Sequence, residues 1–130
     1  MRLLWAAAPW LVVGTALPTI ACPVIEPPLQ QGALEVTWQP DPAPITVGKH
    51  FALDMQICPA HAVLTRADAN MPEHQHGMNY RPSFKRVGDA KDGRWRTEGW
   101  LLHMPGRWDL RLDVQLGGRV EKIIETVMLP

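Results

Sequence analysis

The chain has 130 residues, with thirteen Lys or Arg, thirteen Asp or Glu, and 46% hydrophobic residues. This length suits a single domain with its own core, and the balanced charge excludes a field that would attract nucleic acid or an anionic membrane. The apolar content argues against disorder, and thirteen prolines favour strands and loops because proline breaks helix interiors.

The N-terminal 21 residues are typical of an export signal. Arg2 supplies a short basic start, and residues 3–20 are mostly apolar. Small residues stand three positions and one position before the expected cleavage point, which follows Ala21. We therefore predict a signal peptide at residues 1–21, followed by an extended linker and a domain in the periplasm.

Two alternatives to a cleaved signal peptide remain open. An uncleaved anchor would need a longer uninterrupted apolar stretch, and prolines interrupt this one. A lipoprotein would carry its acyl group on Cys22, although Thr19 departs from the leucine usual three positions before that cysteine. We rank the cleaved form first and the lipoprotein second, and we expect no stable membrane span after cleavage.

Two cysteines, Cys22 and Cys58, remain in the exported chain. In an oxidising compartment an even count predicts one disulfide, which would close a long loop and stabilise the fold by about 3–4 kcal/mol. Acylation of Cys22 would instead leave Cys58 as a free thiol. The two modifications exclude each other.

The remainder of the chain, with residues 22–32 as linker and 33–130 as the domain, has the pattern of an all-β protein. Seven or so short strands are predicted from alternation and β-forming residues. They lie within residues 34–38, 50–58, 62–69, 83–87, 94–103, 108–116 and 120–129. Proline- or glycine-rich turns separate them, at residues 39–44, 88–93, 104–106 and 117–118. This spacing predicts an immunoglobulin-like β-sandwich.

The strongest strand signal lies in residues 108–116, where five apolar residues alternate with polar ones. Residues 50–58 show the same alternation, and the in-phase Met55 is therefore assigned to the core. Met128 stands near the end of the closing strand, and core packing is predicted for it as well.

The segment from residue 71 to residue 78 is unusual because it combines two thioethers, Met71 and Met78, with two imidazoles, His74 and His76. Thioether sulfur suits Cu(I), and imidazole serves both copper oxidation states. In an extended backbone His74, His76 and Met78 would project to one side; Met71 is out of phase, and Pro72 makes a regular strand unfavourable there. The alternative is a surface loop whose methionines only fill space.

A second pair, His103 and Met104, stands before a Pro-Gly turn. Adjacent residues on a strand point to opposite faces, so both can bind one ion only if Pro105 and Gly106 bend the backbone. A turn between strands can bring residue 103 close to the loop around residue 76. We therefore expect at least one of the pair to join the metal site.

Together, residues 68–78 (Asp-Ala-Asn-Met-Pro-Glu-His-Gln-His-Gly-Met) and 100–110 (Trp-Leu-Leu-His-Met-Pro-Gly-Arg-Trp-Asp-Leu) resemble the YtkA-like/FixH-like family of exported domains. The resemblance covers roughly residues 33–129. It implies an immunoglobulin-like fold with a Met/His copper site at one end, in proteins that look like periplasmic metal-handling or copper-oxidase-assembly accessory proteins.

Two classes of function follow from these residues. The first is a periplasmic protein that carries or buffers Cu(I) and exchanges copper with another exported protein. The second is a metal-free interaction or ligand-binding sandwich, supported by Trp95, Trp100 and Trp108, because exposed tryptophans can form a binding platform. An enzyme is not expected, since Ser83 lacks a nucleophile-elbow context and the chain has no phosphate-binding glycine loop.

Overall fold

A computed structural model describes residues 21–22 and 34–130. The predicted signal peptide and most of the predicted linker therefore lie outside the described residues. Within the described part of the chain, no helix is long and apolar enough to cross a membrane.

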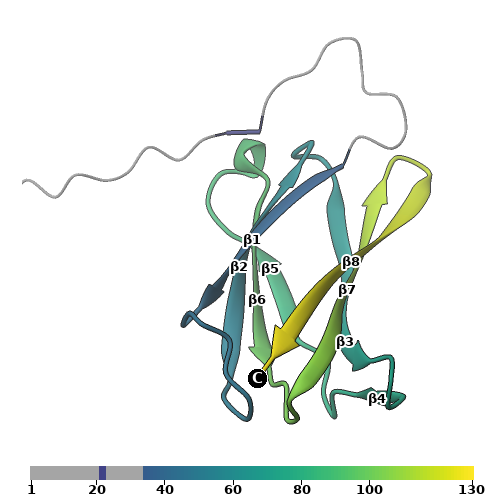
Figure 1. Ribbon diagram of the computed structural model, residues 1–130. Helices are drawn as coiled ribbons and strands as arrows, with labels where there is room; N and C mark the ends of the chain where they lie inside the picture. The colour runs from purple at the N-terminus through teal and green to yellow at the C-terminus, as the bar shows by residue number, and fades with distance from the viewer. Residues whose placement is uncertain (1–20, 23–33) are drawn as a thin grey trace, which may run out of the picture.

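The described chain forms eight strands and one short 3-10 helix, which Figure 1 shows in two layers. In chain order these elements are β1 (Glu35–Asp41), β2 (Phe51–Cys58), β3 (Val63–Met71), β4 (His76–Gly77), β5 (Ser83–Arg86), η1 (Ala90–Asp92), β6 (Arg94–Trp100), β7 (Gly106–Leu116) and β8 (Arg119–Leu129). The predicted all-β class is confirmed.

The strands form two antiparallel four-stranded sheets, in the orders β1-β2-β6-β5 and β4-β3-β7-β8. The chain crosses between the sheets after β2, after β4 and after β6. If the strands are lettered A to G in chain order and the short β4 is left out, the first sheet has the order A-B-E-D and the second the order C-F-G. This is the immunoglobulin arrangement, with β4 as one short extra strand beside C. The predicted immunoglobulin-like sandwich is thus confirmed.

The core lies between the two sheets and is filled by side chains from alternate strand positions. Trp100, Trp108, Ile57 and Val114 are fully buried. The predicted alternation of β7 is observed, because Trp108, Leu110, Leu112 and Val114 face inward while Arg111 is exposed. Met55 is also in the core, as predicted.

Two predicted strand boundaries differ from the structure. Residues 39–44 were expected to be a turn, but β1 continues through Pro40, which pairs with Leu53. β1 is an edge strand, where a residue without an N–H is tolerated. The extended segment predicted from residue 94 to residue 103 is shorter in the structure, because β6 ends at Trp100 and residues 101–105 form a loop.

The prediction that Met128 packs in the core is wrong. Its side chain is 68% exposed, because Met128 pairs with the outward-facing Arg107 of β7. The odd-numbered residues of β8 face the sandwich, and the even-numbered ones face away.

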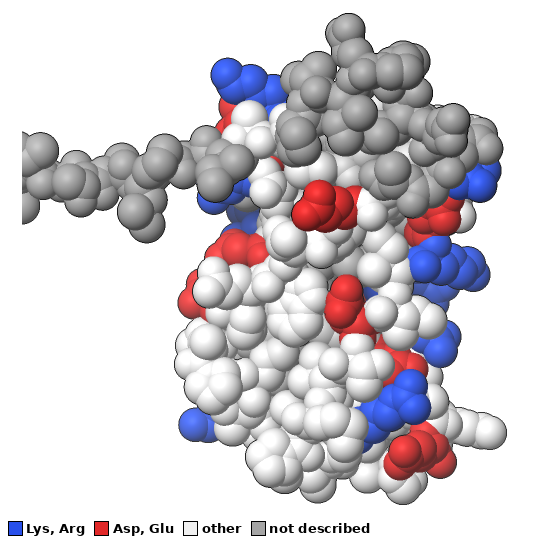
Figure 2. Space-filling model, turned by 45° about the horizontal axis from the view of Figure 1, so that its top comes forward, with Lys and Arg blue, Asp and Glu red and all other residues white. Residues whose placement is uncertain are grey.

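Charged side chains of both signs are interspersed over the face shown in Figure 2, with an uncharged area between them. One cluster lies on the outer face of the first sheet, where Arg96 contacts Asp41, Asp54 and Glu98 at 3.1, 2.9 and 2.8 Å. The hydrogen bond from Arg96 holds the pKa of Glu98 below its ordinary value. These exposed pairs link three strands but contribute little to stability in water.

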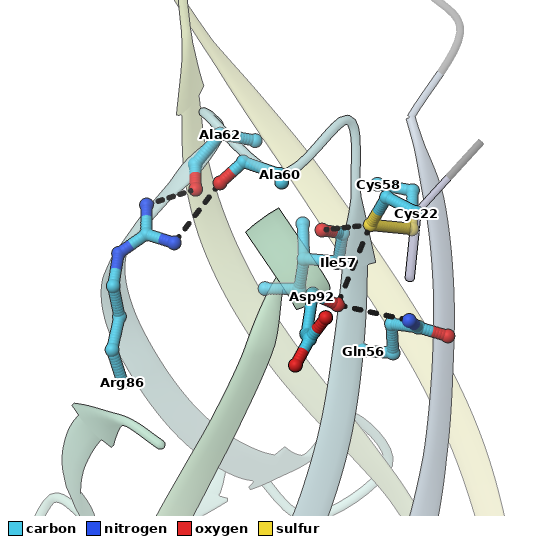
Figure 3. The surroundings of a disulfide bond; sticks show 8 residues. All are labelled: Cys22, Gln56, Ile57, Cys58, Ala60, Ala62, Arg86 and Asp92. Carbon is cyan, nitrogen blue, oxygen red and sulfur yellow. Dashed lines mark hydrogen bonds between the residues drawn. A yellow bond between two sulfur atoms is a disulfide. The ribbon is translucent and has the colours of Figure 1, made fainter. Parts of the chain in front are cut away.

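The predicted disulfide between Cys22 and Cys58 is formed, with a Cα–Cα distance of 5.5 Å. Figure 3 shows its surroundings. The Cys22 Sγ lies 3.4 Å from the Ile57 carbonyl oxygen and 3.6 Å from that of Asp92; a disulfide sulfur carries no proton, so these are close contacts. The bond fixes Cys22 at the end of β2 and engages the thiol that acylation would require.

Candidate metal site at one end of the sandwich

The two Met/His segments reach the same end of the molecule. β3 brings residue 71 to this end, where β7 begins at Gly106. The Met71 methyl carbon lies only 3.1 Å from the position that a Cβ on Gly106 would occupy. Figure 1 shows the loops beside β4 and before β7 at the lower end of the sandwich. The two segments therefore lie at the same end of the sandwich, with β3 between β4 and β7. A contact between residue 103 and the loop around residue 76 stays a prediction.

Met71 is a core residue in this structure. β3 extends two residues beyond its predicted end and ends at Met71, which is 1% exposed. Pro72 does end the strand, but only after Met71 has turned inward. Because Gly106 has no side chain, it leaves room for the Met71 thioether, and this sulfur is shielded from solvent.

Residues 72–75 form a turn, so the extended backbone expected for His74, His76 and Met78 is wrong over this part. The His74 N–H donates to the Met71 carbonyl at 3.3 Å, and Gln75 has a positive φ of 55°. Only His76 and the following glycine are paired with β3. A turn directs neighbouring side chains in different directions, so alternation of faces does not apply here.

The donors of the first segment differ in exposure. Both His74 and His76 are exposed, whereas Met78 is half-buried and packs against the core. The Met78 N–H donates to the Ala69 carbonyl at 3.3 Å, which holds the segment along β3. This segment thus offers two imidazoles that are open to solvent and one thioether that is half-buried.

The second segment is positioned by Trp108. The Trp108 indole N–H donates to the Met104 carbonyl at 2.9 Å, and the His103 ring lies edge-on to the indole, with centroids 5.4 Å apart. Met104 is half-buried against the core, and His103 is exposed. Sequence reasoning missed this role of Trp108, which the Met-Pro-Gly-x-Trp spacing could have indicated.

The donor set is consistent with a soft metal ion. Its accessible members are three imidazoles and two half-buried thioethers, a mixture that suits Cu(I). Among the described residues, no group of three or more His, Cys, Asp or Glu side chains is placed to hold a metal.

The tryptophans do not form the binding platform considered for a metal-free interaction protein. Trp95, Trp100 and Trp108 are 5%, 0% and 0% exposed. Arg86 also covers Trp95, with its guanidinium carbon 4.6 Å from the ring centroid. These rings belong to the core, and the second class of function loses the observation that supported it.

No protein-family model, curated protein or solved structure matches this chain. The resemblance to the YtkA-like/FixH-like family therefore stays a prediction from the residues.

Proposed function

We propose that this protein is a periplasmic copper-binding protein that carries or buffers Cu(I) at the lower end of the sandwich. The proposed ligands are His74, His76 and Met78, with His103 or Met104 completing the set. Met71, a ligand in the sequence-based prediction, is proposed instead to pack beneath the site. The observation that supports the proposal is the presence of two Met/His segments at the same end of the fold.

The burial of the donors supports exchange of copper rather than permanent storage. Exposed imidazoles can be replaced one at a time by ligands from another protein, while half-buried thioethers retain the ion. The turns carry these side chains, and turns reposition more readily than strands. The expected partner is thus an exported protein that receives or donates copper.

Titration of the purified protein with Cu(I) tests the proposal, using competition against a chromophoric chelator. A reductant without thiols keeps the Cys22–Cys58 disulfide intact. Met78→Leu combined with Met104→Leu preserves apolar bulk and should weaken Cu(I) binding at least tenfold. Met71→Leu is the matched control, because it makes the same replacement at a buried methionine that is not a proposed ligand. It should leave the Cu(I) affinity unaltered.

The imidazoles give a second, independent readout. Replacing His74 and His76 by alanine should weaken both Cu(I) and Cu(II), and binding through them should fade in acid because protons compete for the ring nitrogen. Zinc, which prefers nitrogen, thiolate and carboxylate ligands, should be insensitive to the methionine changes. Wild-type Cu(I) affinity in the Met78→Leu, Met104→Leu protein would remove the thioether site and the copper function with it.

A further inference from the structure

The strand β8 leaves one long edge of its sheet unpaired by any described strand. It is 11 residues long and pairs with β7 along its whole length without a register shift. No other described strand lies on its second side. β8 contains no proline and no bulge, which are two of the devices by which proteins block an exposed edge, although it does carry charged residues such as Lys122.

The hairpin geometry fixes which backbone groups face outward. Residues Gly117 and Gly118 form a two-residue turn between the paired residues Leu116 and Arg119. The residues that flank such a turn are a hydrogen-bonded pair, and hydrogen-bonded pairs then alternate. The N–H and C=O groups of the even-numbered residues of β8 therefore point to the open edge.

The same even-numbered residues carry an apolar stripe on the outer face of the sheet. Val120, Ile124 and Met128 are 55%, 54% and 68% exposed, and the polar residues Lys122 and Thr126 stand between them. Large apolar side chains next to unpaired backbone groups are the features of a strand-pairing surface.

The charges of β8, together with the number of residues that can pair, favour one self-pairing register. A twofold at Thr126 opposes no like charges but pairs only residues 123–129 of the strand. With a twofold axis at Ile124, all 11 residues pair, Val120 faces the partner's Met128, and Lys122 faces the partner's Thr126. A twofold at residue 123 would place Glu121 opposite the partner's Glu125, and one at Glu125 would place that residue opposite its own copy. A twofold at Lys122 would oppose two lysines. Like charges directly opposite each other destabilise a strand pair.

We propose that β8 pairs antiparallel with β8 of a second copy of this chain, with Ile124 on the twofold axis. The two sheets then join into one continuous eight-stranded sheet. Apolar residues face apolar residues on its outer face, and Lys122 faces threonine. Antiparallel pairing directs the two Met/His ends away from each other, so both stay accessible in the dimer.

The mass of the full-length purified protein in solution tests this pairing, by sedimentation or light scattering. One strand per subunit covers less surface than a standard interface, so we expect a monomer–dimer equilibrium between micromolar and millimolar concentration. Ile124→Lys would oppose two lysines on the axis and should abolish the dimer. Val63→Lys is the matched control, because Val63 is 40% exposed but lies on β3, which β7 separates from β8.

Cysteine crosslinking tests the register. Facing Cα atoms in such a pair are about 5.5 Å apart, within disulfide range, so Ile124→Cys should give a covalent dimer on mild oxidation. Lys122→Cys is separated from its copy by more than about 13 Å and should not. A monomer throughout the concentration range, an oligomer that survives Ile124→Lys, or equal crosslinking of the two cysteine variants would each overturn the proposal.

Discussion

Substitution of Gly93 by alanine tests how the disulfide end of the sandwich is built. Gly93 has a φ of 63° and closes η1. A Cβ placed there would lie 2.3 Å from the Ile57 carbonyl oxygen and 2.6 Å from the Cys22 Sγ. The carbonyl belongs to the backbone of β2, and the sulfur is fixed by its bond to Cys58, so neither atom can move aside cheaply.

Two costs add in the Gly93→Ala protein. The left-handed backbone costs a non-glycine residue about 1–2 kcal/mol, and overpacking a closed site costs about 1–3 kcal/mol more. The hydrogen bond from the Ile57 N–H to the Gly93 carbonyl, 2.8 Å long, is also put at risk. We therefore expect a loss of about 2–5 kcal/mol, against a total stability of about 5–15 kcal/mol for a domain of this kind.

Urea unfolding followed by tryptophan fluorescence measures this loss, since the core contains several buried indoles. Gly48→Ala is the matched control, because Gly48 has a φ of 73° and no atom within 4 Å of the added Cβ. The control pays only for its backbone conformation and should lose about 1–2 kcal/mol. Equal stability loss in the two variants would refute the packing argument, because the clash would then contribute nothing.

Three further predictions concern stability. Leu112→Asp should unfold the domain, because Leu112 is 2% exposed and an unpaired buried charge costs several kcal/mol. A thermal melting temperature close to that of the unmodified protein would show that Leu112 does not face the core. Reduction of the Cys22–Cys58 bond should lower the free energy of unfolding by about 3–4 kcal/mol. The intact mass of the purified protein should correspond to the oxidised form without an acyl group. Arg96→Met should lessen the loss of stability in acid: the lowered pKa of Glu98 stabilises the fold above the ordinary glutamate pKa, and that contribution disappears as pH falls through the lowered value. Because these exposed pairs contribute little to stability, the change in the acid-unfolding profile should be small. An unchanged pKa of Glu98 in the Arg96→Met protein, measured by NMR titration, would contradict the pairing.

The sequence was sufficient to predict elements whose pattern is local. The alternation from residue 108 to residue 116 predicts β7 correctly because a strand buried on one face repeats every two residues. The Gly117-Gly118 turn is similarly evident, since few other sequences connect two strands so tightly. The number and spacing of such strands also predict an immunoglobulin-like sandwich, whereas the order of the strands within each sheet is known only from the structure.

Errors arose where a distant residue decides the outcome. Pro72 suggests an irregular backbone, but Met71 still turns inward because Gly106, 35 residues later, leaves space for its thioether. The face of Met128 was also ambiguous, since β8 carries apolar residues at both odd and even positions. Only the register with β7, in which Leu112 faces Ile123, decides which set is buried.

The two ends of the sandwich can be perturbed separately. β3 begins near the disulfide end and has nine residues, so Met71 lies about 26 Å from Val63 along the strand. Effects of substitutions at such a separation are usually additive. Gly93→Ala should therefore lower the free energy of unfolding without changing Cu(I) affinity. Met78→Leu should weaken Cu(I) binding without changing the free energy of unfolding. If Gly93→Ala weakened copper binding while the protein stayed folded, the metal-binding loops would depend on packing at the far end, and the picture of donors held locally by β3 and Trp108 would fail.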